Sequence, residues 1–144
     1  MTNWTLRQAA PADATGLTDC FRAAYAVYTG RVDDLPDVAG SIAEEVARHP
    51  VWVAVSGNRV LGGVVVVLGK TAHLANVAVH PDASGQGIGR ALIAQAERAA
   101  ADAGYSALHL ATHVKLTENI AFYTHLGWVE TRREGNKVLM SRPL

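Results

Sequence analysis

Apolar and polar positions along the chain follow two different spacings, which predict helices and strands. Helices are predicted where apolar residues recur every three or four positions between start and stop signals: 11–28, 41–49, about 90–103 and 118–126. Strands are predicted where shorter, mostly apolar runs are bounded by turn residues: 4–9, 51–56, 60–68, 74–79, 106–112, 128–133 and 138–142. The order is strand, two helices, three strands, helix, strand, helix and two strands. It predicts a mixed α/β fold with a parallel crossover around the third helix.

Turn and cap residues fix several of these boundaries. Gly-Asn at 57–58 predicts a hairpin, and Glu-Gly-Asn at 134–136 predicts a second one. The glycine pair at 62–63 predicts a bulge. Ser41, with Glu44 three residues later, is typical of the capping box that begins a helix.

The composition indicates a single globular domain without a dominant charge. With 144 residues, 49% of them hydrophobic, the chain can bury a core, and we take residues 1–144 as one domain. Thirteen basic residues balance thirteen acidic ones, which argues against nucleic acid or a membrane surface as a partner. The longest apolar run, 60–69, is about half as long as a membrane span. Cys20 is the single cysteine, so we expect a buried core thiol and a cytoplasmic protein.

A glycine-rich loop joins the central apolar strand to the third helix. We expect the strand, 74–79, to be buried on both faces, because its residues are mostly apolar. Gly85, Gly87 and Gly89 then occupy every second position up to the helix start. Glycine admits positive φ and close approach of a ligand, and the first helix N–H groups have no partner inside the helix. Loop and helix start therefore form a candidate cradle for an anion, most simply a phosphate.

Two common phosphate loops do not fit this stretch. The dinucleotide pattern GxGxxG requires a third glycine where this chain has Arg90 or Leu92, depending on the starting glycine. A P-loop requires Gly-Lys followed by Ser or Thr, and the sequence contains no such tripeptide. A plain strand-to-helix turn and a generic nucleotide-phosphate site remain as alternatives.

The stretch does resemble the acyl-CoA-binding motif of the GCN5-related N-acetyltransferases, the GNAT family. The family consensus is Gln or Arg, two residues, Gly, one residue, then Gly or Ala; Gly87 and Gly89 fill the glycine places. Ser84 stands at the Gln or Arg position, a departure that removes one side-chain contact and leaves the backbone cradle. The resemblance implies acetyl-CoA as acyl donor, no metal, and a cofactor-binding segment of seven residues: Ser84, Gly85, Gln86, Gly87, Ile88, Gly89 and Arg90.

The order of elements is similar to that of the GNAT fold along essentially the whole chain. The resemblance implies a central, mixed, mostly antiparallel sheet of about seven strands flanked by about four helices. It also implies a bulge in the central strand, near Val77, Ala78 and Val79, whose backbone N–H groups meet the thioester oxygen. Such an N–H can lower the reaction barrier by roughly 3 kcal/mol.

A second motif lies at 117–128 and resembles the last conserved motif of the family. Phe122, Tyr123, Gly127 and Trp128 occupy its apolar, tyrosine, glycine and aromatic places. The resemblance implies that Tyr123 protonates the departing thiolate, with Phe122 beside the cofactor. The chemistry agrees, because a phenol with a pKa of about 10 keeps its proton at pH 7 until the thiolate charge develops. A tyrosine that only packs its ring against the core is the alternative.

Asn119 is a further candidate for cofactor binding. It precedes Tyr123 by one helical turn and so lies on the same helix face. Family members often have an asparagine seven residues before the tyrosine, where this chain has Leu116. Asn119 is thus a candidate hydrogen-bond partner of the pantetheine arm or a phosphate, and a helix asparagine without a ligand is the alternative.

The general base is left open among three residues. His73, His113 and Glu118 are candidates, directly or through water, and histidine is favoured by its pKa of about 6.5. On a strand, His109 and His113 would share one face. Their strand spacing, without cysteine or an evident third carboxylate ligand, argues against a metal site.

The acceptor is expected to be a small-molecule amine or a protein amino group. In the family the segment after the first strand shapes the acceptor site, and here acidic and aromatic residues outnumber basic ones. It contains Tyr25, Tyr28, Asp33, Asp34, Asp37, Glu44 and Glu45 against Arg31 and Arg48. This composition favours a small cationic amine, with a solvated acidic loop as the alternative. A noncatalytic acyl-CoA sensor is the alternative function, and the exposed end strands offer an edge for a homodimer.

Overall fold

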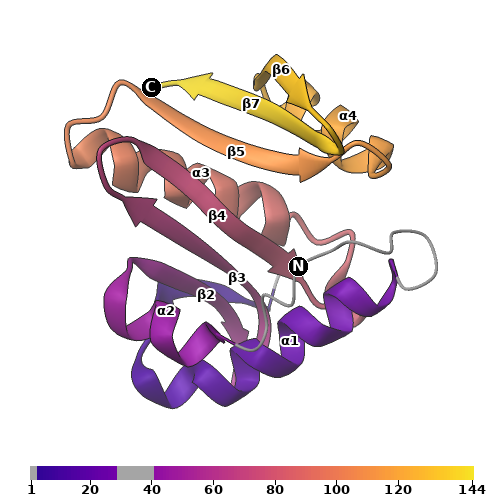
Figure 1. Ribbon diagram of the computed structural model, residues 1–144. Coiled ribbons are helices and arrows are strands. Elements are labelled where there is room, and N and C mark those ends of the chain that lie inside the picture. Colours follow the sequence, from indigo (N-terminus) through magenta and orange to yellow (C-terminus); the bar gives the residue numbers. More distant parts are fainter. Residues whose placement is uncertain (1–2, 29–40) are drawn as a thin grey trace.

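The computed structural model describes residues 3–28 and 41–144. Over these residues it contains one seven-stranded sheet and four α-helices (Figure 1). The strands are β1 (Thr5–Gln8), β2 (Val51–Ser56), β3 (Arg59–Leu68), β4 (Ala72–Val79), β5 (Ala107–His113), β6 (Val129–Glu134) and β7 (Lys137–Pro143). The helices are α1 (Ala14–Ala26), α2 (Ile42–Arg48), α3 (Ile88–Asp102) and α4 (Thr117–His125), with short 3-10 helices η1 (Pro11–Asp13) and η3 (Pro81–Ala83).

The sheet is mixed and mostly antiparallel, as the family resemblance implies. Its strand order is β1-β2-β3-β4-β5-β7-β6, and β4 with β5 is the one parallel pair among the described strands. The crossover between them runs through α3. Both predicted hairpins are present, with Gly57 at φ +58° and Gly135 at φ +57° in their turns. The predicted element order is therefore confirmed.

Helices cover both faces of the sheet, and each face has its own core. α1 and α2 lie on one face and α3 on the other (Figure 1). The core under α1 and α2 includes Leu17, Phe21 and Ile42, while the core under α3 includes Leu92 and Trp128. The predicted stripe of buried residues on α1 includes Cys20, which is 1% exposed. Burial raises the pKa of the Cys20 thiol to about 11, so it stays protonated and inert at neutral pH.

The glycine pair of β3, Gly62 and Gly63, lets α3 and α1 approach the two faces of the sheet. The bulge predicted at the pair lies one residue earlier, because the β2–β3 register passes over Leu61. A Cβ at Gly62 would lie 3.0 Å from Ile88 Cγ2, and a Cβ at Gly63 would lie 2.4 Å from Leu17 Cδ2. The pair is thus required for packing on both sides rather than for the bulge itself.

Replacing Gly63 with alanine is expected to lower the free energy of unfolding by about 1–3 kcal/mol, because the added methyl overlaps the buried side chain of Leu17. Denaturant unfolding measures the loss. Gly69→Ala is the matched control, since the nearest atom to its added Cβ is 4.0 Å away. Equal stability of the two variants would contradict the packing role.

Burial along β4 alternates, so the prediction of burial on both faces is wrong. The β3–β4 register passes over Ala75, which marks a bulge in β4. Before the bulge Leu74 packs in the core under α3, whereas after it Ala78 packs in the core under α1. The bulge therefore exchanges the faces of the strand, and it lies at Ala75 rather than at the predicted 77–79.

β4 and β5 pair only where they begin. The paired residues are Ala72 with Leu108 and His73 with His109. Beyond them the two strands separate (Figure 1), while β5 stays paired with β7 along its length. The edge of β4 that faces β5 therefore offers backbone groups without a strand partner over 74–79.

The capping box predicted at the start of α2 is absent. Ser41 is the N-cap residue, but its side chain makes no capping hydrogen bond. Its ψ of 10° is not the extended backbone that the capping geometry uses. The helix itself begins and ends as predicted, with Glu44 and Glu45 in the first turn and Arg48 in the last.

Candidate active site

A cavity of about 910 Å³ fills the space between the separated strands β4 and β5. Its walls come from the end of α1, the second half of β4, the start of α3, the end of β5, α4, and the β6–β7 hairpin. A cavity of this size, at a break in a sheet, is typical of a binding site for an extended small molecule.

The glycine loop forms an open cradle at one end of this cavity. Gly85 and Gly87 have φ of +79° and +80°, which explains why glycine stands at both positions. Gly87 is the N-cap of α3, and no side chain caps the helix. The helix bonds begin with Ala91 N–H donating to the Gly87 carbonyl, at 3.1 Å. The N–H groups of residues 88–90 therefore have no acceptor inside the helix and are placed to bind an anion.

Eight of the thirteen predicted site residues line the cavity, and five do not. Those that line it are Val77, Ala78, Val79, Ser84, Gly89, Asn119, Phe122 and Tyr123. The other five lie in the loop and first helical turn beside it: Gly85, Gln86, Gly87, Ile88 and Arg90. Ile88 turns its side chain into the core, where it is 2% exposed, so only its backbone is placed for a ligand.

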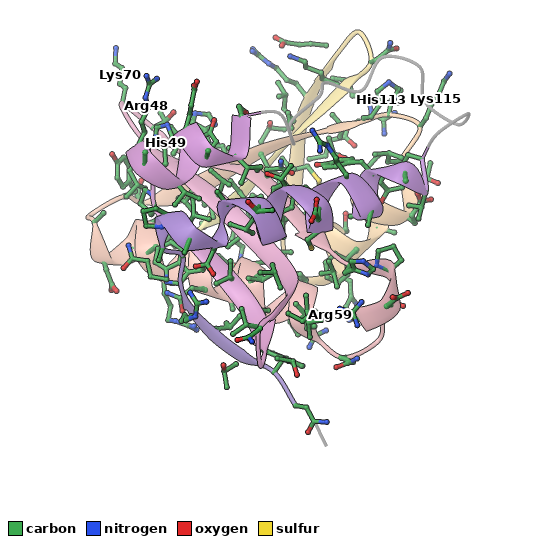
Figure 2. The ribbon with its side chains drawn as sticks, turned by 90° about the horizontal axis from the view of Figure 1, so that it is seen from below. Arg48, His49, Arg59, Lys70, His113 and Lys115 are labelled. Atoms are coloured by element: carbon green, nitrogen blue, oxygen red, sulfur yellow. The ribbon has the colours of Figure 1, made fainter. Side chains whose placement is uncertain are left out.

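The loop is tied to the rest of the fold by contacts that the sequence did not predict. Arg59, from the β2–β3 hairpin (labelled in Figure 2), forms an ion pair with Asp82 at 3.0 Å. His80 Nδ1 accepts the Asp82 N–H at 3.1 Å, and the His80 N–H donates to the Leu61 carbonyl at 2.7 Å. Arg59 and Asp82 are both exposed, so the backbone bonds contribute most to the order of the loop.

Tyr123 lies in the wall of the cavity formed by α4. Its side chain is 8% exposed, and its ring lies 5.9 Å from the rings of Phe122 and Trp128, measured between centroids. Burial raises the pKa of Tyr123 above its ordinary value of 10, with nearby Tyr25 and Tyr28 adding to the shift. The ring therefore packs against its aromatic neighbours, and the role of Tyr123 as an acid stays a prediction. The hydroxyl stays protonated and can act as an acid.

Polar side chains join the segment at the end of α1 to the first turn of α4. The Asn119 side chain lies 3.5 Å from the hydroxyl of Tyr28. Tyr25, one turn earlier on α1, donates its hydroxyl to Asn76 Oδ1 at 2.5 Å. Asn76 was not predicted as a site residue, although the signal was there: it is the one amide in the otherwise apolar run 74–79.

Of the three candidate bases, only His113 lines the cavity. Its Nδ1 accepts the backbone N–H of Lys115 at 3.1 Å, and the two side chains lie together in Figure 2. In the neutral ring this bond places the hydrogen on Nε2. His73 lies outside the cavity, against the His109 ring at 5.7 Å, and burial and His109 lower its pKa. Glu118 is exposed on α4 and also lies outside the lining.

Two of the histidines lie against each other, without a group of three ligands among the described residues. His109 contacts His73, and within residues 3–28 and 41–144 no three His, Cys, Asp or Glu side chains are grouped to hold a metal ion. Over the same ranges, no helix has the length and apolar character needed to span a membrane.

Part of the predicted acceptor region lies outside the described residues: Arg31, Asp33, Asp34 and Asp37. The remaining members divide between two places. Tyr25 and Tyr28 line the cavity, whereas Glu44, Glu45 and Arg48 are on α2 and do not.

A family model described as the acetyltransferase (GNAT) domain matches residues 47–130, which is more than half of the chain. The chain therefore belongs to the GNAT family, and the class of protein that fold and family define is an N-acetyltransferase. A search of curated protein sequences gives no significant match.

Solved structures of acetyltransferases share the fold over nearly the whole chain. The PaiA N-acetyltransferase from Thermoplasma acidophilum, in complex with coenzyme A, aligns with a TM-score of 0.88 at 16% identity, covering 99% of this chain and 100% of that one. YncA from Salmonella typhimurium, with acetyl-CoA, gives 0.77 at 20% identity, covering 99% and 95%. An acetyltransferase from Thermus thermophilus gives 0.77 at 21% identity, covering 99% and 98%. At these identities the likeness establishes the fold.

Proposed function

We propose that this protein transfers the acetyl group of acetyl-CoA to a primary amine of a small molecule or a protein, by direct attack of the amine on the thioester. The observation that carries the proposal is that Ser84 and Gly89, on either side of the glycine loop, line the same cavity as Tyr123. An anion-binding cradle alone would suit many phosphorylated ligands. A buried, protonated phenol in the same cavity can give its proton to a departing thiolate.

The pyrophosphate, pantetheine arm and thioester of acetyl-CoA would occupy successive parts of the cavity. The free N–H groups at the start of α3 would bind the pyrophosphate, with Arg90 exposed beside them. The unpaired edge of β4 would bind the amide groups of the pantetheine arm as an added strand would. The thioester would then lie between β4 and Tyr123, since both line the middle of the same cavity. Two structures with the same fold contain coenzyme A or acetyl-CoA, which supports acetyl-CoA as the ligand.

In the proposed reaction the amine nitrogen attacks the thioester carbon. The new carbon–nitrogen bond forms as the carbonyl electrons move to oxygen, and backbone N–H groups of β4 near the bulge stabilise that charge. The carbon–sulfur bond then breaks, and Tyr123 gives its proton to the departing sulfur. The amine proton leaves to water or to His113, the one predicted base on the cavity wall.

The proposal also covers the extent of the domain, its location, the acceptor and the assembly. We treat residues 1–144 as one acetyltransferase domain in the cytoplasm, and the coverage of 99% of this chain by the PaiA structure supports the single domain. The acceptor would enter beside Tyr25 and Tyr28, and the acidic composition of the following segment still favours a cationic amine. The exposed edge strand β6 supports a homodimer as the assembly to test.

A thiol-release assay tests the function. Purified protein is supplied with acetyl-CoA and a panel of small amines and peptides with free N-termini, and binding of acetyl-CoA is measured separately by titration calorimetry. We expect acetyl-CoA to bind and at least one amine to yield both free thiol and its acetylated product. Binding of acetyl-CoA with no product from any acceptor would favour the noncatalytic sensor instead.

A further inference from the structure

Asn76 is a polar side chain in an apolar strand, and it is 8% exposed. It follows the bulge residue Ala75, and the change of face at the bulge turns it toward α1. It lines the cavity on the part of β4 that has separated from β5. A buried amide at this place must have both of its polar atoms satisfied, or one of them reserved for a ligand.

One of the two polar atoms of Asn76 is already occupied. The hydroxyl of Tyr25 donates to Oδ1 at 2.5 Å. Burial raises the pKa of Tyr25 to about 12, so the phenol remains a donor across the neutral range. This bond leaves the amide N–H₂ of Asn76 without a hydrogen-bond partner among the described residues, on the wall of the cavity.

This free donor and Tyr123 lie on the wall of one cavity, where the thioester is proposed to bind. Tyr25 and Tyr123 line the same cavity as Asn76. In a thioester the sulfur and the carbonyl oxygen are bonded to the same acyl carbon. If the sulfur contacts the Tyr123 hydroxyl, the carbonyl oxygen therefore lies close by. That oxygen is a hydrogen-bond acceptor, and the proposed binding mode brings it into the cavity that Asn76 lines.

We infer that the Asn76 amide N–H donates to the carbonyl oxygen of the acyl thioester, and that Tyr25 is a positioning residue that holds the amide in this orientation. The inference rests on the proposed function. When the amine attacks, the carbonyl electrons move to oxygen, and an N–H already aimed at that atom stabilises the charge without reorganising. The amine proton leaves to solvent, the carbon–sulfur bond breaks, and the Tyr123 proton goes to sulfur. Asn76 adds a side-chain donor to the backbone donors of β4.

Infrared difference spectroscopy of bound acetyl-CoA labelled with ¹³C at the thioester carbonyl tests this directly. A donated hydrogen bond lowers the carbonyl stretching frequency. We expect the band to rise in Asn76→Asp, which keeps the oxygen that Tyr25 binds but replaces the N–H₂ group by oxygen. Tyr25→Phe should raise the band less, because the amide remains but is free to rotate. If Asn76→Asp does not fold, the carbonyl band of Tyr25→Phe still tests the inference.

Asn136→Asp is the matched control, because it also places a carboxylate on the cavity wall in exchange for an amide, at a residue with no proposed role in binding the cofactor. It should leave the carbonyl band where the wild-type protein has it. With an acceptor from the panel, Asn76→Asp should lower kcat by at least about 10-fold.

The outcomes separate this inference from the proposed function. A wild-type protein that binds no acetyl-CoA would overturn both. Normal binding of acetyl-CoA with the same carbonyl band in wild type, Asn76→Asp and Tyr25→Phe would overturn the inference alone. A loss of activity limited to acceptors with a carbonyl group beside the amine, with an unchanged band, would also overturn it, because Asn76 would then bind the acceptor.

Discussion

Replacing Gly89 with aspartate is expected to weaken the binding of acetyl-CoA by at least about 10-fold without lowering the melting temperature. Gly89 lies in the first turn of α3 and lines the cavity. A Cβ there would lie 3.6 Å from Val79 Cγ2 and 3.8 Å from Phe122 Cζ, which are ordinary contacts. The carboxylate would interact favourably with the helix N-terminus, so the fold is retained. It would also repel the pyrophosphate and compete for the same N–H groups.

Gly89→Asn is the control for the shape of the new side chain, because it matches aspartate in size without its charge. We expect it to bind acetyl-CoA more tightly than Gly89→Asp. The difference between the two variants should shrink as the salt concentration rises. Titration calorimetry gives the affinities, and thermal unfolding checks the fold. Equal affinities for the two variants would place the pyrophosphate away from the start of α3.

The parts of this fold that the sequence predicts are those governed by local rules. Gly85 and Gly87 have the positive φ that their spacing before a helix indicates, and the hairpin at 57–58 forms as its turn residues require. The element order is also local, since each strand or helix is specified by its own apolar pattern. These local features were enough to place the cradle at the start of α3.

The parts that the sequence does not predict depend on pairing between distant strands. The bulge at Ala75 is defined by the register between β3 and β4. The separation of β4 from β5 is defined by the end of their pairing after His73 and His109. Nothing in a single run of residues encodes either feature, because both are set by how the strands twist and pack. The expected position of the bulge was therefore two residues too far along, and β4 was expected to be buried on both faces.

The polar part of the site was only half predictable for the same reason. Tyr123 could be assigned because its motif is contiguous, and Asn119 because it lies one helical turn away. The bond between Tyr25 and Asn76 joins residues 51 positions apart, and it depends on the bulge to turn Asn76 toward α1. Local spacing cannot select such a pair, although an amide in an apolar strand marks the position as unusual.

Removing the Tyr123 hydroxyl is expected to lower kcat by at least about 10-fold while leaving the affinity for acetyl-CoA nearly unchanged. In Tyr123→Phe the ring keeps its contacts with Phe122 and Trp128, so the fold is maintained. The lost group acts when the carbon–sulfur bond breaks, which is why kcat changes rather than binding. Thiol-release kinetics with an acceptor from the panel measure the effect. Tyr105→Phe is the control, because its hydroxyl donates to the Gly69 carbonyl away from the cavity.

The pH dependence separates an acid from a residue that only packs. Burial raises the pKa of Tyr123 above 10, so the phenol keeps its proton to a higher pH than a tyrosine in water. For wild type, kcat should therefore not fall with an alkaline limb until the pH exceeds 10. For Tyr123→Phe, the limb due to this ionisation should be absent and the residual rate should depend on the acidity of the leaving thiol. A variant with wild-type kcat at every pH would show that the thiolate leaves without a proton from Tyr123, and the ring would then serve the core alone.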